Sequence, residues 1–241
     1  MKKFLHILKL AFRGANTSEV LKENDPLKTL KHCDLEKPRT EMRILSRADY
    51  PMKKSFSRSL EKLTITGCAL RRFDTRILDL TRLYSLDLSN NQLTSLPDDI
   101  SSLVALKQLY LNKNQFEYFP KCILNQSISK SLTVLELCDN ALKFIPPKLS
   151  SLKELVTLRL DRNNIQCLQG DIGTMTKMRY LTVAENQLKF VPWSFQLLNL
   201  MEVDVSDNLF HVDFSVDANS MMVPKIPSLF ELLARFIVCR G

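Results

Sequence analysis

Leu83-Tyr-Ser-Leu-Asp-Leu-Ser-Asn-Asn-Gln-Leu-Thr-Ser-Leu-Pro-Asp-Asp-Ile-Ser-Ser-Leu103 carries the pattern on which the fold prediction for this chain rests. Within it, Leu86 and Leu88 alternate with polar neighbours, which is the period of two expected of a half-buried β-strand. Asn91 then turns the chain, and further apolar residues follow at positions 93, 96, 100 and 103. One such coil cannot bury its own apolar side chains, so the stretch predicts stacking against similar neighbours.

The same spacing recurs on both sides of this stretch and defines seven units. Most units are 23 residues long, and their first apolar residues are Leu60, Leu83, Leu106, Leu132, Leu155, Met178 and Leu200. The third unit is longer by three residues, which lie around positions 125–130. Because the strand leucines on either side stay in phase, we expect this insertion on the convex side or at an edge.

An asparagine follows the strand in six of the seven units, and Cys68 takes its place in the first. An amide side chain has two N–H donors and a carbonyl acceptor, so it can satisfy backbone groups that a tight turn would bury unpaired. A thiol can do this only weakly, which suits a unit at the edge. We therefore predict a structural ladder formed by Asn91, Asn114, Asn140, Asn163, Asn186 and Asn208.

The pattern LxxLxLxxNxL is that of leucine-rich repeats, and it predicts an α/β leucine-rich repeat solenoid with a parallel sheet on its concave side. An apolar residue followed by proline recurs at 96–97, 119–120, 145–146 and 191–192. Proline lacks a backbone donor, so it prevents a second sheet on the convex side. We assign residues 1–58 to an N-terminal helix, a linker and a capping strand, 59–222 to the solenoid, and 223–241 to a C-terminal helix.

Both flanks carry apolar patterns of their own. An amphipathic helix is expected near the amino terminus, because apolar residues recur there at helical spacing: Phe4, Leu5, Leu8, Ala11 and Phe12. The segment Met42-Arg-Ile-Leu-Ser46 predicts a strand that could pair with the first repeat and cover its exposed apolar end.

Charge and length limit the classes of function. The chain has 241 residues, of which 45% are hydrophobic, and a net charge of +8. Residues 1–58 contain 14 Lys and Arg against 7 Asp and Glu, whereas residues 59–241 contain 20 against 19. A nearly neutral repeat region without a basic stripe argues against direct binding of nucleic acid. A membrane-spanning helix needs about 20 consecutive apolar residues, and the sequence contains no such run.

The sequence offers no residues for catalysis, a metal or a cofactor. The six cysteines form no CxxC pair and have no metal-ligand spacing with the three histidines, His6, His32 and His211. Five glycines form no phosphate-binding loop, and no nucleophile motif accompanies a histidine. We therefore expect a protein that is not an enzyme. Free thiols are typical of a reducing compartment, which favours the cytosol or the nucleus.

The side chain between the two buried positions of each strand should point away from the core, on the concave surface. These positions hold Thr64, Asp87, Tyr110, Glu136, Arg159, Thr182 and Asp204. Adjacent positions on the same surface hold Gln108, Asn112, Thr157, Asp161 and Tyr180. Solenoids bind partners on such surfaces, and Tyr and Arg are common anchors. For any single residue, an ordinary solvated strand position is an equally good interpretation. As a set, we predict that Asp87, Tyr110, Glu136, Arg159 and Tyr180 contact a protein partner.

A second apolar helix is predicted at the C-terminal end. Ser228 and Glu231 form a capping box, and apolar residues follow at helical spacing: Leu229, Leu232, Leu233, Phe236 and Ile237. This helix could simply cap the solenoid. It is also similar to an elongin-binding box, whose pattern is a small residue, a leucine, often a cysteine four residues later, and then an aliphatic residue. In that comparison Ser228, Leu229 and Ile237 match, and Leu233 replaces the cysteine.

Together with residues 4–16 and 42–51, the repeats and this helix resemble the leucine-rich repeat protein 1 family, the substrate receptors of cullin-2/elongin ubiquitin ligases. The resemblance spans nearly the whole chain. It implies a nuclear, non-catalytic adaptor that binds elongin B/C and cullin-2 and presents a ubiquitinated substrate, in that family the replicative helicase at replication termination. It assigns elongin C binding to Ser228, Leu229, Leu233 and Ile237. The family's N-terminal pleckstrin-homology-like domain and cullin-selecting box are expected to be missing from this sequence.

A different class of function fits the repeats alone. The alternative is a leucine-rich repeat scaffold that regulates a phosphatase or a small GTPase. The two hypotheses differ in the C-terminal helix. A scaffold would bury its apolar face on the seventh repeat, whereas a receptor would leave Leu229, Leu233 and Ile237 available to elongin C.

Overall fold

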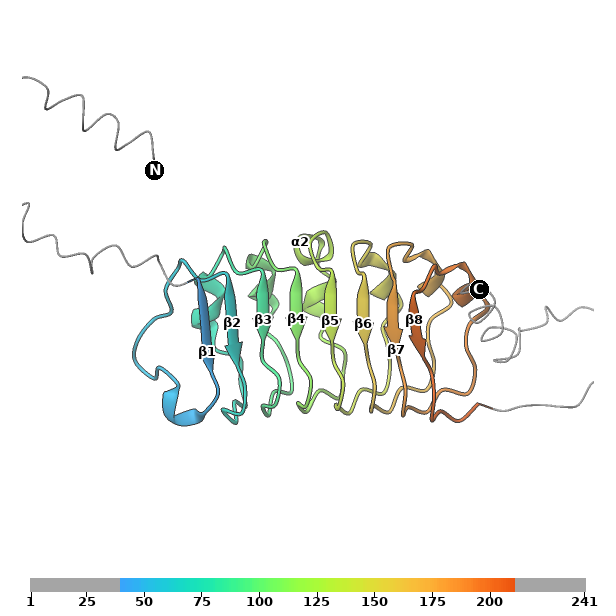
Figure 1. The fold of residues 1–241 in the computed structure, drawn as a ribbon, viewed down its shortest axis with the longest axis horizontal. Coiled ribbons are helices and arrows are strands. Elements are labelled where there is room, and N and C mark those ends of the chain that lie inside the picture. Colours follow the sequence, from blue (N-terminus) through green and yellow to red (C-terminus); the bar gives the residue numbers. More distant parts are fainter. Residues whose placement is uncertain (1–39, 211–241) are drawn as a thin grey trace, which may run out of the picture. The chain divides into compact units, whose positions relative to one another are not determined.

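The computed structural model describes residues 40–210 of the chain. Eight short strands in this part form one parallel sheet, in which the order of the strands follows the sequence (Figure 1). The strands are β1 (Glu41–Ile44), β2 (Lys62–Ile65), β3 (Ser85–Asp87), β4 (Gln108–Tyr110), β5 (Val134–Glu136), β6 (Thr157–Arg159), β7 (Tyr180–Thr182) and β8 (Glu202–Asp204). The parallel sheet predicted for the seven units is therefore present, with one strand from each unit and β1 added at the edge.

Each strand from β1 to β7 is followed by a turn and a short helical segment that returns the chain to the start of the next strand. The 3-10 helices are η1 (Arg47–Asp49), η2 (Thr75–Asp79), η3 (Asp98–Ser102), η4 (Lys121–Leu124), η5 (Pro147–Ser151), η6 (Ile172–Thr174) and η7 (Trp193–Leu197). Proline precedes four of them, at positions 97, 120, 146 and 192. Since proline lacks a backbone donor, the return paths form helical turns and not a second sheet.

The strands stay in phase along the whole sheet. Leu63 pairs with Leu86, and the same column continues through Leu109, Leu135, Leu158, Leu181 and Val203. Most of these side chains have no exposed surface, and they form one continuous core with the apolar residues of the return paths. Burial of this column between neighbouring coils is the main source of stability, because no single coil encloses its own core.

The insertion in the third unit leaves this register intact. Its extra residues form α2 (Gln126–Ser129), which is the only α-helix within residues 40–210. Leu109 of β4 still pairs with Leu135 of β5, as in every other step of the sheet. The insertion therefore lies on a return path and not in a strand, in agreement with the prediction of the convex side or an edge.

The predicted strand near Met42 is β1, and it pairs in parallel with β2 from Glu41 opposite Lys62 to Ile44 opposite Ile65. The segment that follows β1 is held by Arg76. This guanidinium donates to the carbonyl oxygens of Pro51 at 2.6 Å and Lys54 at 2.7 Å.

The same arginine is fixed on its other side by an acid and two aromatic rings. Arg76 pairs with Asp74 at 2.6 Å and lies 5.7 and 5.2 Å from the ring centres of Tyr50 and Phe56. Tyr50 also donates to Asp74. Burial acts to raise the pKa of Asp74, but the hydrogen bonds from Arg76 and Tyr50 outweigh it and lower this pKa. The cluster anchors the cap of the solenoid to the first return path.

The asparagine ladder is present in all six predicted units. Asn163 is typical. Its Nδ2 donates to the carbonyl oxygens of Leu160 in its own coil and Leu137 in the preceding coil, both at 2.9 Å, and its Oδ1 accepts from the backbone N–H of Leu142 at 3.0 Å. In the first unit, the thiol of Cys68 points to the carbonyl oxygens of Thr66 at 3.4 Å and Ile44 at 3.8 Å. Each ladder asparagine thus joins two coils, and the cysteine does so weakly.

The residue before each ladder position has a left-handed backbone conformation. Gly67 has a φ of 66°, and six other residues adopt φ between 52° and 55°: Asn90, Lys113, Asp139, Arg162, Glu185 and Asp207. This conformation costs a non-glycine residue roughly 1–2 kcal/mol. The hydrogen bonds of the neighbouring asparagine fix the turn in spite of this cost.

The remaining predictions for the ends of the chain fall on residues that the structure does not describe. The predicted N-terminal helix and the predicted helix at 228–237 lie outside residues 40–210. Of the assigned regions, residues 1–39 of the first, 211–222 of the solenoid and all of 223–241 also lie outside this range. Within the described range, no helix has the length and apolar character to cross a membrane. No group of three or more His, Cys, Asp and Glu in that range is placed to hold a metal ion.

Replacing Asn163 with leucine tests the ladder. Leucine has about the same size but cannot pair with Leu137, Leu142 or Leu160, so their buried backbone groups lose a partner. We expect the free energy of unfolding to fall by about 1–3 kcal/mol. The measurement is thermal unfolding followed by circular dichroism. Asn164→Leu is the matched control, because Asn164 is exposed and, among the described residues, its side chain only accepts one hydrogen bond, from Gln187 at 3.3 Å. Equal melting temperatures for the two variants would contradict the ladder's role.

Candidate protein-binding surface

The outward-pointing side chains of the strands form one surface, here called the sheet face. Its central row is Thr64, Asp87, Tyr110, Glu136, Arg159, Thr182 and Asp204, which lie between the buried positions of successive strands. Asp87 is the direct neighbour of Tyr110, Tyr110 of Glu136, and Glu136 of Arg159. The register therefore brings four of the five predicted contact residues together on adjacent strands. Tyr180 lies in the row closer to the amino ends of the strands, paired with Thr157 and Glu202.

The middle of the central row is acidic. Arg159 Nε lies 4.0 Å from Glu136 Oε1, and the arginine side chain is 44% exposed, so this ion pair is loose and contributes little to stability. Burial raises the pKa of Tyr110, and the carboxylates of Glu136 and Asp87 on either side raise it further. Arg159 and Tyr110 remain partly accessible. This part of the face suits a partner that offers a cationic or hydrogen-bonding group to Tyr110 and its acidic neighbours.

Two polar residues of the sheet face form hydrogen bonds between strands. Asn112 donates to Glu136 Oε2 at 2.8 Å and accepts from the backbone N–H of Cys138 at 2.8 Å. Asp161 accepts from the Thr182 hydroxyl at 2.6 Å and from the backbone N–H of Ala184 at 2.9 Å. Asn112 and Asp161 lie on this face as predicted from the sequence, but their hydrogen bonds were not predicted. Their shared position, directly after a strand, was the only available signal.

These hydrogen bonds distinguish side chains of the sheet face that hold the scaffold from side chains that are available to a partner. Asn112 and Asp161 use their oxygens to hold the next coil, and Asn112 also orients Glu136. Tyr110 has no hydrogen bond from its hydroxyl to any residue between 40 and 210, and Arg159 has only its loose pair with Glu136. Tyr110 and Arg159 are therefore the side chains best able to contact a partner without breaking the scaffold.

Cys138 lies on this face beside Asp161, with its sulfur 3.5 Å from Asp161 Oδ2. Burial raises the pKa of the Cys138 thiol to about 12, and the negative charge of Asp161 adds to the effect. Since a thiolate is the reactive form of cysteine, this thiol is protected against alkylation and oxidation near neutral pH.

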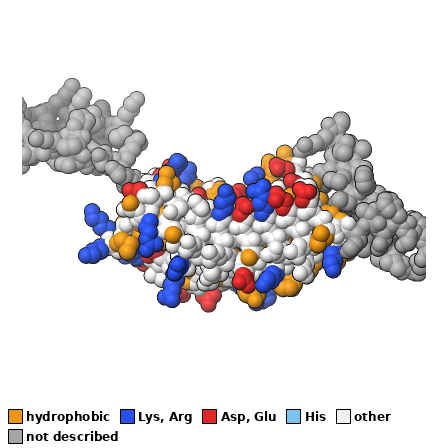
Figure 2. Space-filling model, turned by 90° about the horizontal axis from the view of Figure 1, so that it is seen from below, with side chains coloured by type: hydrophobic (Ala, Val, Ile, Leu, Met, Phe, Trp, Pro, Cys, Tyr) orange, Lys and Arg blue, Asp and Glu red, His pale blue; other side chains and the backbone are white. Residues whose placement is uncertain are grey.

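The turns at the carboxyl ends of the strands carry charges that pair along the solenoid. Arg162 lies 3.7 Å from Asp139 of the preceding coil and 2.8 Å from Glu185 of the next. Figure 2 shows Lys/Arg and Asp/Glu side chains gathered side by side on this edge of the molecule. The positions are equivalent from coil to coil, so opposite charges meet at the repeat distance.

The residues predicted to bind elongin C lie elsewhere in the chain. Ser228, Leu229, Leu233 and Ile237 fall outside residues 40–210, and the structure does not test their arrangement.

The Leucine rich repeat family matches this chain twice, over residues 58–116 and 130–188. These ranges include β2 to β4 and β5 to β7, with their ladder asparagines. The chain forms a leucine-rich repeat solenoid. A leucine-rich repeat protein of Leptospira interrogans has a similar structure, with a TM-score of 0.54 and 25% identity over 64% of this chain and 45% of that one.

A second structural relative is the leucine-rich repeat ectodomain of the Arabidopsis thaliana receptor kinase GASSHO1/SCHENGEN3. Its structure was solved in complex with CASPARIAN STRIP INTEGRITY FACTOR 2. It is 31% identical, with a TM-score of 0.53, over 63% of this leucine-rich repeat chain and 19% of that chain.

Two curated relatives match nearly all of the solenoid chain, and both are named Leucine-rich repeat protein 1. The protein of Mus musculus is 43% identical over 224 residues, which are 93% of this chain and 52% of the relative. The protein of Homo sapiens is 41% identical over 238 residues, which are 99% of this chain and 56% of the relative. The predicted resemblance is therefore confirmed. The chain spans about half the length of these relatives.

Replacing Asp161 with asparagine should make Cys138 more reactive. The change removes the negative charge beside the thiol, so the pKa falls and the thiolate fraction rises. Burial still opposes ionisation. We therefore expect alkylation by iodoacetamide at a fixed, mildly alkaline pH to become faster by up to about tenfold, which corresponds to one pKa unit. Mass spectrometry of the peptide that contains Cys138 measures the rate.

The pH dependence separates this effect from local unfolding. In the parent chain the folded-state pKa lies above the ordinary value of 9.0, so this thiol's contribution to stability is lost as the pH rises from 9.0 towards 12. In Asp161→Asn the alkylation curve should move to lower pH. Asp139→Asn is the control, because Asp139 adjoins Cys138 in sequence but pairs with Arg162. An unshifted curve in Asp161→Asn would exclude the electrostatic coupling.

Proposed function

We propose that this chain is the non-catalytic substrate-recognition subunit of a cullin-2/elongin B/C ubiquitin ligase. Its sheet face would bind the substrate, and the segment from Ser228 to Ile237 would bind elongin C. By resemblance, the substrate is the ubiquitinated replicative helicase at replication termination, and the site of action is the nucleus.

The similarity to proteins named Leucine-rich repeat protein 1, at 41–43% identity along nearly the whole chain, carries this proposal. The match to the Homo sapiens protein covers 99% of the chain, so it extends beyond the repeats and includes residues 228–237, which carry the elongin-box pattern. The sheet face adds physical support, because Tyr110 and Arg159 present unsatisfied polar groups on a frame held by hydrogen bonds. Tyrosine and arginine contribute more than other residues at the centres of protein interfaces.

Elongin C recognition would use one face of the predicted C-terminal helix. Leu229, Leu233 and Ile237 are spaced four residues apart, so a helix places them in one line for insertion into an apolar groove. Ser228 would cap the first turn of that helix. Leu233 is larger than the cysteine found in many such boxes, so packing in the groove should be tighter.

The decisive experiment mixes the purified full chain with the elongin B/C complex. Leu229→Glu would place a charge in an apolar groove, so we expect loss of the complex in size-exclusion chromatography and isothermal titration calorimetry, with an unchanged circular dichroism spectrum. Glu231→Gln is the control, because position 231 falls on the opposite side of the predicted helix. If the parent chain does not bind elongin C at micromolar concentration, the helix is a cap, and the scaffold that regulates a phosphatase or small GTPase becomes the better account.

The substrate surface has a separate test. The triple variant Tyr110→Ala, Glu136→Ala and Arg159→Ala should fold and still bind elongin B/C, but it should lose most of its affinity for purified ubiquitinated helicase, because it removes the centre of the sheet face. The control is Asp98→Ala, Lys121→Ala and Lys148→Ala, three exposed residues on the return paths. Equal substrate affinity for the two triple variants would place the contact away from the sheet face.

A further inference from the structure

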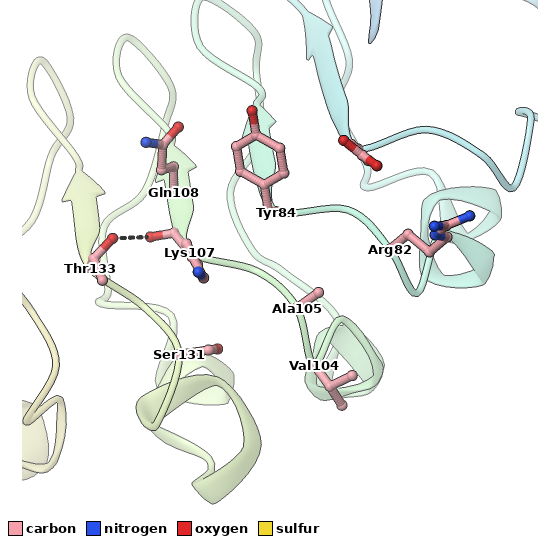
Figure 3. Close-up of a pocket in the computed structure, with 9 residues that line it drawn as sticks. Arg82, Tyr84, Val104, Ala105, Lys107, Gln108, Ser131 and Thr133 are labelled. Atoms are coloured by element: carbon pink, nitrogen blue, oxygen red, sulfur yellow. Dashed lines mark hydrogen bonds between the residues drawn. The ribbon is translucent and has the colours of Figure 1, made fainter. Parts of the chain in front are cut away.

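A hollow opens at the amino ends of β3, β4 and β5, on the side opposite the asparagine ladder. It has a volume of about 550 Å³ and is lined by Glu61, Arg82, Tyr84, Val104, Ala105, Lys107, Gln108, Ser131 and Thr133. Figure 3 shows Tyr84 between Arg82 and Lys107, with Val104 and Ala105 below them, Thr133 on the far side of Lys107 and Ser131 below Lys107. The insertion of the third unit builds one wall, because Ser131 follows α2 and donates to the carbonyl of Ile128 at 3.2 Å.

The two cations of the hollow have no charged or hydrogen-bonding partner in the described part of the chain. The side chains of Arg82 and Lys107 form no ion pair or hydrogen bond with any residue from 40 to 210, and both are exposed. Glu61 is the one carboxylate in the lining, and the charge of the lining is therefore +1, from two cations and one acid. Lys62 adds a further positive charge at the rim, with its amine 5.7 Å from the centre of the Tyr84 ring.

Equivalent positions of successive coils form rows along the solenoid, and Arg82 and Lys107 belong to two such rows. Elsewhere in these two rows, the cationic side chains have partners. Lys177 occupies the position equivalent to Arg82 four coils later, and it pairs with Glu154 of the preceding coil at 2.6 Å. At Arg82 the corresponding neighbours in the preceding and following coils are Ser59 and Ala105, which carry no charge.

Arg179 occupies the row of Lys107, and its side chain has hydrogen-bond partners. Its guanidinium donates to the carbonyl oxygens of Thr176 and Met178, both at 2.9 Å, and of Asn199 at 3.2 Å. Among residues 40–210, the Lys107 amine has no such partner, and its row neighbours are Tyr84 and Thr133. In these two rows, Lys177 and Arg179 therefore have partners among the described residues, whereas Arg82 and Lys107 do not.

Among the side chains of Gln108, Ser131 and Thr133, only that of Gln108 has donors left for an anionic oxygen ligand. Thr133 and Ser131 already donate their hydroxyl hydrogens to backbone carbonyls, at 3.1 and 3.2 Å. The side-chain amide of Gln108 has no partner within the described residues. Arginine binds carboxylate and phosphate through two parallel hydrogen bonds, and lysine adds a point charge.

We propose that this hollow binds an acidic segment of a protein partner, with a carboxylate or phosphate group held between Arg82 and Lys107 and against the Tyr84 ring. Gln108 connects the hollow to the sheet face, because it begins β4 and lies two residues from Tyr110 on the same side of the strand. A protein bound to the sheet face therefore reaches the hollow. Glu61 at the rim and the acidic centre of the sheet face oppose a continuous polyanion such as nucleic acid.

This inference rests on the protein-binding role of the sheet face and is independent of elongin binding. It predicts a partner surface with two parts: a basic or hydrogen-bonding group over Tyr110 and Glu136, and an acidic group at the amino edge. If elongin C does not bind, the proposal for the hollow still stands, because the elongin experiment tests residues 228–237.

The test uses three synthetic peptides of equal length that differ at one central position, which is glutamate, phosphoserine or glutamine. Each is titrated into the full, nitrogen-15-labelled chain, and backbone amide shifts are followed by NMR. Both acidic peptides should shift amides in 82–84, 104–108 and 131–133, whereas the glutamine peptide should not. Higher salt should weaken binding. Tighter binding of the phosphoserine peptide would indicate a phosphorylated segment, and equal binding would indicate a carboxylate; either result supports the site.

Three variants sharpen the result. Arg82→Gln with Lys107→Gln should weaken binding by about tenfold or more, because two charge-assisted contacts are lost. Lys177→Gln with Arg179→Gln makes the same change in charge in the same rows, and it should leave affinity unchanged. Glu61→Gln should strengthen binding, an effect that a merely structural role of the hollow would not produce.

Three results would overturn the proposal. The first is no shift with either acidic peptide at millimolar concentration. The second is an equal loss of affinity in the two double variants. The third is a single-stranded oligonucleotide that shifts the same amides and binds more tightly than both peptides, which would make the hollow a nucleic-acid site.

Discussion

Every coil of this solenoid depends on its neighbour to satisfy buried polar groups, and the ladder asparagines provide that connection. Asn91, for example, accepts from the backbone N–H groups of Cys68 and Leu70 and donates to the carbonyl of Ile65, all in the preceding coil. The same side chain also closes its own turn through the carbonyl of Leu88. One residue thus fixes both the shape of a turn and its register with the next coil, while the leucine column supplies the burial.

The sequence was sufficient to predict this framework because the framework is periodic. The strand phase, the ladder and the place of the insertion all follow from the recurrence of single residues at fixed spacing, and β1 followed from an alternating apolar pattern. The cap at Tyr50, Asp74 and Arg76 could not be predicted in this way. Tyr50 and Asp74 are 24 residues apart, and they have no counterparts in other units that would mark their positions. Their pairing depends on how the chain after β1 folds back on η2.

The candidate surface was predicted in part. Alternation along the strands placed Asp87, Tyr110, Glu136 and Arg159 on one face, and the register then made them neighbours. Alternation does not distinguish a side chain that binds a partner from one that binds the next coil. Asn112 and Asp161 use their oxygens to hold neighbouring strands, and only the distances between coils reveal this role. Surface position is thus a weaker guide to binding than the hydrogen bonds that a side chain leaves unmade.

A solenoid also makes unpaired charge informative, because each exposed position has two neighbours in its row at nearly constant spacing. Glu154 beside Lys177, and Asp139 and Glu185 beside Arg162, show that cations in some rows of this chain pair with acids of the neighbouring coils. Arg82 lies between Ser59 and Ala105, so its row offers it no acid. An exposed ion pair contributes little to folding, and its absence therefore costs the fold little. The same absence leaves a hydrated cation free to pair with a partner's anion. Selection for partner binding can therefore act on such positions with little effect on stability, and comparing row neighbours coil by coil is a physical way to find them.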